Sequence, residues 1–208
     1  MSLLVVVGFS AEAALLPRGV AVLNAAANPA RLAAALAVMR PSAILSFGIA
    51  GGLDPGLRPG ALVVARDVVA EARWPAHAEW SAALAAATGA RVADIAGADA
   101  VVASAAEKAA LRARTGAAVV DMESAVIART GIPFAVLRAV ADTATEALPQ
   151  AAAEGLDEAG NPAPWRVLRA LLRRPGELPA VIRMGWRSQV ALRALASVAT
   201  EASHGPPV

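Results

Sequence analysis

The chain has 208 residues, of which 57% are hydrophobic and only 3% aromatic, and its formal net charge is +2. This length fits one α/β domain with a core built mainly from Ala, Val and Leu. The absence of cysteine excludes disulfides and thiolate metal sites, and the only two histidines, His77 and His204, are too far apart in sequence to suggest a histidine-rich metal centre.

Short β-branched runs alternate with alanine-rich stretches over the first 146 residues. The apolar runs predict strands at 3–7, 20–23, 43–47, 61–69, 91–95, 119–122 and 133–140. The stretches between them predict helices at 29–39, 76–88, 104–114 and 123–129. Asn28 is the expected N-cap of the first helix, and Ser104 with Glu107 forms a capping-box pattern. We expect a three-layer α/β/α fold with a central mixed, largely parallel sheet.

The carboxyl-terminal part has a different character. Prolines and glycines between 149 and 164 predict a loop, either a lid or an insertion, and two helices follow at 165–174 and 178–199. Residues 203–208 are expected to be a frayed tail. We therefore predict one domain over 1–208, in which 148–200 is a loop plus an arginine-rich helical segment packed on the rest.

Charge is concentrated in this segment. Seven arginines but only one acid, Glu177, lie between residues 161 and 195. An acidic partner or an anionic membrane surface, contacted through 164–193, is one interpretation, particularly with Trp165 and Trp186 nearby. Ordinary sheet-covering helices with solvated arginines are the other. Basic residues are sparse elsewhere, which disfavours nucleic acid binding. No apolar run has the roughly 20 residues of a membrane span, and the start lacks signal-peptide features, so we expect a cytoplasmic location.

Carboxylates follow the predicted strands. Residues 119–126 read Val-Val-Asp-Met-Glu-Ser-Ala-Val, and Asp142 ends the next apolar run. In α/β sheets, ligands bind beyond the carboxyl ends of the strands, so these acids are expected to share one site. A glycine loop at 47–53 would let backbone approach a ligand. It lacks the dinucleotide fingerprint, and the only lysine, Lys108, is not part of a Walker motif.

Each acid also has a structural interpretation. Asp121 and Glu123 could cap the following helix, Asp142 could cap a turn with Thr143, and Glu12 could be a solvated acid in a first helical turn. Four acids near strand ends beside a glycine loop, without histidine, cysteine or lysine candidates, favour carboxylate chemistry. Cleavage of a glycosidic bond is the reaction class that such acids serve.

Four segments resemble the nucleoside phosphorylase/nucleosidase superfamily. They are Glu12 followed by Leu15-Leu16, the Ala50-Gly51-Gly52-Leu53 loop, the segment 120–125, and Arg138-Ala139-Val140-Ala141-Asp142. The stretches 142–149 and 171–179 resemble a narrower, hopanoid-biosynthesis-associated phosphorylase subgroup, which removes adenine from adenosylhopane. The resemblance implies a nucleoside phosphorylase-like fold and a homo-oligomer.

The resemblance also implies roles for individual residues. Asp142 would be the general acid that protonates N7 of adenine, Glu123 would hold the ribose 2′-hydroxyl, and Glu12 would position or deprotonate the attacking water. Met122 would pack on the ribose. The remaining substrate-binding positions are Gly48, Ile49, Ala50, Gly51, Val101 and Val102. Val101 stands where the family's nucleosidase has an aromatic residue, so purine stacking should be weaker or supplied from elsewhere.

Two departures from the family pattern bear on the reaction. Ala141 replaces a serine before the acid, which removes one orienting hydrogen bond. Ser46 and Ile49 stand where bacterial phosphorylases have the arginine and serine that bind phosphate. A buried phosphate without an arginine is costly, so water is favoured as the nucleophile, with phosphate as a possible co-substrate and no other cofactor.

Two alternatives to an enzyme acting on adenosylhopane stay open. A nucleosidase for a soluble nucleoside, such as methylthioadenosine, S-adenosylhomocysteine or futalosine, would have a compact polar pocket rather than an apolar channel near 148–190. A non-catalytic module that binds a nucleoside or a lipid would keep the fold without releasing adenine.

Overall fold

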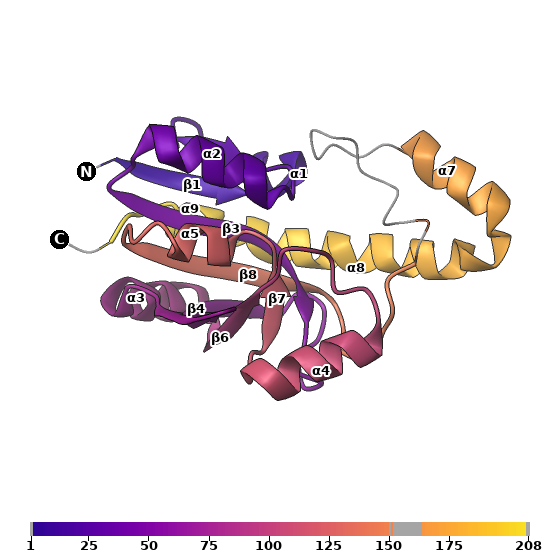
Figure 1. Ribbon diagram of the computed structural model, residues 1–208. Helices are drawn as coiled ribbons and strands as arrows, with labels where there is room; N and C mark the ends of the chain where they lie inside the picture. The colour runs from indigo at the N-terminus through magenta and orange to yellow at the C-terminus, as the bar shows by residue number, and fades with distance from the viewer. Residues whose placement is uncertain (1, 150, 152–163, 207–208) are drawn as a thin grey trace.

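The computed structural model describes residues 2–149, 151 and 164–206, with only the backbone described for 164–166 (Figure 1). Eight strands form one sheet: β1 (Leu3–Val7), β2 (Val22–Asn24), β3 (Ala43–Gly52), β4 (Leu62–Val69), β5 (Arg73–Pro75), β6 (Arg91–Gly97), β7 (Val119–Asp121) and β8 (Phe134–Asp142). Their order is β2-β1-β3-β7-β6-β4-β5. Because β8 pairs with both β3 and β4, the central strands close into a ring.

The sheet is mixed, as predicted. Parallel pairs join β1 to β2 and β3, β3 to β8, and β6 to β4 and β7. Antiparallel pairs join β3 to β7, and β4 to β5 and β8. The sequence did not indicate the ring, because which strands pair across the sheet depends on contacts between distant segments.

Helices cover both faces of the sheet. On one face, α2 (Pro29–Met39) and α5 (Ser124–Ala128) pack with Leu32 and Ile127 against Ile44 and Val136. On the other, α3 (Ala78–Thr88), α8 (Leu178–Ala196) and α9 (Ala199–Ala202) lie over Leu45, Phe47 and Leu137. Alternate residues of β3 and β8 belong to the two clusters, as the period of a strand requires. The predicted three-layer α/β/α architecture is confirmed.

The remaining helices lie at the edges of this core. They are α1 (Ser10–Ala13), α4 (Ala105–Thr115), α7 (Pro164–Arg173) and the 3-10 helix η1 (Pro175–Glu177). Both predicted caps are present: Asn28 accepts from the Arg31 amide, and Ser104 and Glu107 form a reciprocal capping box. In Figure 1, α7 stands away from the sheet, and α8 runs back behind the strands toward the C-terminus. No helix in the described ranges is both long enough and apolar enough to cross a membrane.

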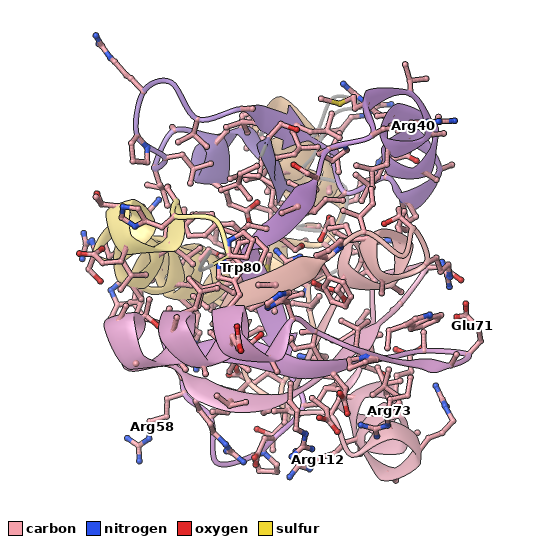
Figure 2. The ribbon with its side chains drawn as sticks, turned by 90° about the vertical axis from the view of Figure 1, so that its left-hand side faces the viewer. Arg40, Arg58, Glu71, Arg73, Trp80 and Arg112 are labelled. Carbon is pink, nitrogen blue, oxygen red and sulfur yellow. The ribbon has the colours of Figure 1, made fainter. Side chains whose placement is uncertain are left out.

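Three local predictions need correction. The glycine stretch 48–52 is not a loop but the second half of β3, because it continues the pairing with β8. The predicted strand 20–23 is β2 at 22–24. The tail is not frayed as far as His204, because its carbonyl accepts a hydrogen bond from Trp80 Nε1 at 3.1 Å. Figure 2 shows Trp80 between α3 and the C-terminal segment. Most of the predicted loop and the side chain of Trp165 lie outside the described residues.

Candidate active site

A cavity of about 220 Å³ opens at the carboxyl ends of β3, β7 and β8. Ile49, Ala50 and Gly51 of β3 form one part of its wall, and Val101 and Val102, after β6, form another. Met122 and Glu123 follow β7, and Asp142 ends β8. Leu148, and Met184 and Ser188 of α8, complete the wall from the carboxyl-terminal part. The cavity therefore joins segments from the whole length of the chain.

Gly51 explains why Glu123 and Asp142 reach the same cavity although β7 and β8 do not pair. It is opposite Val120 of β7 on one side and Asp142 of β8 on the other. At the next position, Gly52, an added Cβ would lie 2.7 Å from the carbonyl oxygen of Asp142. A side chain there would push β8 away, so this approach of the strands requires glycine.

Arg138 holds a group of buried acids beside the cavity. Its Nε donates to Asp121 Oδ2 at 2.7 Å, and its Nη2 donates to Ser46 Oγ at 2.7 Å and to Glu123 Oε2 at 3.2 Å. Asp121 also accepts from the Ser124 amide and hydroxyl, so it caps the start of α5 as one interpretation expected. Glu123 makes no capping hydrogen bond, which rules out the capping interpretation for that residue.

Glu12 is not the solvated acid that one interpretation allowed. It is 1% exposed, and its carboxylate accepts from the amides of Gly8 (2.8 Å), Phe9 (2.9 Å) and Ile49 (2.7 Å). Burial raises the pKa of the Glu12 carboxyl above its usual value, while Arg138 and these amides act in the opposite direction. An added Cβ at Gly48 would lie 2.5 Å from Glu12 Oε1, so Gly48 makes room for this carboxylate.

The carboxylates of Glu12 and Glu123 both lie close to Gly8. An added Cβ at Gly8 would lie 2.9 Å from Glu123 Oε1 and 3.6 Å from Glu12 Oε2. Burial raises the pKa of Glu123 to about 7, with Asp121 and Glu12 adding to the increase and Arg138 opposing it. Around neutral pH this pair of acids can therefore hold or release a proton.

Asp142 is paired with the only lysine of the chain. Lys108 Nζ, which is fully buried, forms an ion pair with Asp142 and also donates to the carbonyls of Thr143 (2.9 Å) and Glu146 (3.0 Å). Burial raises the pKa of Asp142, and Lys108 lowers it. In the turn that follows, Thr143 Oγ1 donates to Glu146, while the Asp142 side chain pairs with Lys108.

The ten predicted site residues thus divide into two groups. Eight of the ten line the cavity, whereas Glu12 and Gly48 lie behind its lining, where Glu12 accepts from the amide of the lining residue Ile49. Sequence reasoning missed Lys108 and Arg138 as parts of the site. An arginine inside an otherwise apolar strand is a signal for Arg138, because a charge there must be paired. Lys108 gives no such signal on a helix where lysine is ordinary.

The model of the phosphorylase superfamily matches residues 10–173, which is more than three quarters of the chain. The chain belongs to this superfamily. The match confirms the predicted family and an enzyme of this class. It does not test the narrower hopanoid-associated subgroup. No curated sequence matches the chain closely enough to count as a relative.

Solved structures agree on the fold. A 5′-methylthioadenosine/S-adenosylhomocysteine nucleosidase from Colwellia psychrerythraea 34H, in complex with adenine, is 21% identical, with a TM-score of 0.62 over 70% of this chain and 84% of that one. A nucleosidase from Streptococcus pyogenes is 18% identical over 95% and 97% of the two chains, with a TM-score of 0.62. Futalosine hydrolase of Helicobacter pylori is 16% identical over 94% and 95%, with a TM-score of 0.64.

Proposed function

We propose that this phosphorylase-superfamily enzyme hydrolyses the N-glycosidic bond of an adenine nucleoside, and that its substrate is adenosylhopane or a nucleoside with a similar large apolar group. The observation that carries the proposal is the single cavity on which Glu123 and Asp142 meet, with Glu12 directly beneath. A glycosidase needs such acids to protonate the leaving group, stabilise a cationic sugar and activate water.

In this mechanism Asp142 donates its proton to N7 of adenine as the bond between C1′ and N9 breaks. Glu123 accepts a hydrogen bond from the ribose 2′-hydroxyl, and Met122 packs on the sugar. Water attacks C1′ and gives its proton to Glu12, so that adenine and a free sugar leave. Lys108 is a positioning residue that holds Asp142 and stabilises the carboxylate formed after proton transfer.

Water suits this cavity better than phosphate. No basic side chain lines it among the described residues. Arg138, the nearest buried guanidinium, is already engaged by Asp121, Glu123 and Ser46. A phosphate dianion would therefore enter beside three acids without a charged partner, at a high desolvation cost.

An apolar substituent suits the walls better than a polar one. Val101, Val102, Leu148 and Met184 surround the carboxylates. The volume of about 220 Å³ is small for a ligand site, so a tail as large as a hopane must extend out of it. Met184 places α8 in the cavity wall beside Leu148. The similar nucleosidase and futalosine hydrolase folds make a soluble nucleoside the second candidate.

The test follows free adenine after incubation with adenosylhopane and with methylthioadenosine, each with and without phosphate. We expect release from adenosylhopane without phosphate, and a loss on the order of 10²–10⁴-fold in Asp142→Asn. Because Lys108 lowers the pKa of Asp142, Lys108→Met should move the alkaline limb of the rate to higher pH.

The substrates and variants separate the alternatives. Strict phosphate dependence would replace hydrolysis by phosphorolysis, and release from methylthioadenosine alone would favour the soluble substrate. A protein that releases no adenine from either, and whose Asp142→Asn variant keeps full ligand affinity, would be a binding module.

A further inference from the structure

The helices α7 and α8 expose an unusual share of the apolar surface. Ten large hydrophobic side chains are exposed in the described residues, and five of them lie between 168 and 186. They are Leu168, Leu172, Leu178, Ile182 and Trp186, with exposed fractions from 48% for Leu178 to 77% for Leu172. A clustered apolar surface of this kind marks an interaction site more often than scattered single residues do.

These residues form one apolar stripe on each helix, because they are four residues apart. Leu168 and Leu172 are four residues apart on α7, and Leu178, Ile182 and Trp186 follow the same interval on α8. Residues four apart lie on one face of a helix. The face that packs on the sheet is a different one, since it carries Ala191 and Leu195, which are fully buried. Thus α8 has an apolar face on the core and a second apolar stripe in solvent.

Arginines flank the stripes. Arg169 and Arg173 are exposed on α7, and Arg183, 57% exposed, lies on α8. Among the described residues, two acids lie near these arginines: Glu146 pairs with Arg183 and Arg187, and Glu177 accepts from the Ala151 amide. An apolar stripe bordered by basic residues is the pattern of a helix lying in the interface of an anionic bilayer.

The position of the stripes fits an amphiphilic substrate. Met184 and Ser188 line the cavity from α8, on the face that also carries the buried Ala191 and Leu195, while Ile182 and Trp186 lie on the outer face of the same helix. Figure 1 shows α7 projecting beyond the sheet, where it can reach a flat surface. The helix that walls the cavity therefore also carries the exposed stripe.

We propose that this surface, defined as the exposed apolar residues of α7 and α8 with their flanking arginines, docks the protein peripherally on an anionic lipid bilayer. A second copy of the chain fits less well, because in a two-fold contact the same surface meets itself and its arginines would face one another. The proposal rests in part on the apolar substrate of the proposed function, but lipid binding is measured without substrate, so the failure of one is distinguishable from the failure of the other.

The experiment is co-sedimentation of the full chain with phosphatidylcholine vesicles, with and without phosphatidylglycerol. We expect binding to the anionic vesicles that weakens as salt is added. The double variant Ile182→Ser/Trp186→Ser should bind the anionic vesicles at least on the order of tenfold more weakly than the wild type, because two large apolar side chains no longer enter the interface.

The matched control is Val38→Ser/Met39→Ser, which removes two exposed apolar side chains from α2. It should bind vesicles like the wild type, and both variants should melt near the wild-type temperature. Adenine release from methylthioadenosine should be equal in the wild type and both variants, because none of the four substituted residues lines the cavity. Absence of vesicle binding, or an equal loss in the control, would overturn the proposal. So would a wild-type dimer that Ile182→Ser/Trp186→Ser converts to monomer without any effect on lipid binding.

Discussion

Arg138 allows three carboxylates to be buried close together. It contacts Asp121 and Glu123 directly, and its charge also lowers the pKa of Glu12. One positive charge cannot neutralise three negative ones, so protonation of an acid is favoured. Burial is the main cause that raises the pKa of Glu123 to about 7, and the charges of Asp121 and Glu12 add to the increase while Arg138 opposes it. The same imbalance that suits proton transfer should reduce the stability of the fold at high pH.

We predict a specific pH dependence for Glu123. Its pKa is 4.5 when unfolded and about 7 when folded, so the folded state binds the proton more tightly. The stability from this group is fully present below pH 4.5 and is lost as pH rises toward 7. Relative to Glu123→Gln, which cannot ionise, the wild type should lose on the order of 3 kcal/mol of unfolding free energy across this window.

Urea unfolding of both proteins at pH 5 and pH 8 measures this difference. Asp142 titrates in both proteins, so the difference between them reports the titration of Glu123 together with its coupling to Glu12. Parallel changes in the two proteins between these pH values would show that Glu123 is ionised throughout.

At the scale of elements, close contact between β6 and α5 sets the position of the Asp-Met-Glu segment. Gly97 ends β6, and an added Cβ would overlap the Cβ of Ala125 and lie 3.1 Å from the Ala125 amide nitrogen. The Ala98 amide in turn donates to the Asp121 carbonyl at 2.8 Å. The small residues Gly97 and Ala125 allow α5 to lie close against the sheet. This contact also fixes the start of α5, which follows Glu123 directly.

We therefore expect Gly97→Ala to destabilise the protein by about 1–3 kcal/mol, because backbone must move to admit the methyl group. The matched control is Gly185→Ala on α8, where an added Cβ meets nothing within 4 Å. That change should stabilise by about 0.5–1 kcal/mol, since alanine favours a helix over glycine. Thermal unfolding of the two variants gives the comparison. Equal effects would mean that the crossing of β6 and α5 is loose.

At the scale of the whole molecule, the carboxyl-terminal helix α8 completes a site whose carboxylates all lie in the first 146 residues. Leu195 of α8 is fully buried in the same cluster as Val5, Phe47 and Leu137. The hydrogen bond from Trp80 to His204 fixes the end of this segment. The packing of the core, part of the cavity wall and part of the proposed lipid surface therefore depend on α8.

Leu195→Ala tests this dependence. Removing a fully buried leucine should cost about 2–5 kcal/mol through lost burial and the cavity left behind. Leu172→Ala, at an exposed leucine of α7, should change stability by less than about 0.5 kcal/mol. Chemical denaturation measures both. A small effect at Leu195 would mean that α8 covers the sheet without stabilising it.

The sequence by itself determined the layers of the fold and most of the cavity wall. Continuous apolar runs identify buried strands whichever strands they pair with. The acids that follow these runs can be read directly from the sequence. It could not determine which strands are neighbours, so the ring closed by β8 and the role of Gly51 came only from the tertiary structure. Nor could it pair Lys108 with Asp142, 34 residues away, or Arg138 with Ser46, 92 residues away. Such pairings depend on three-dimensional proximity, which local patterns do not encode, and they set the pKa values on which the proposed chemistry relies.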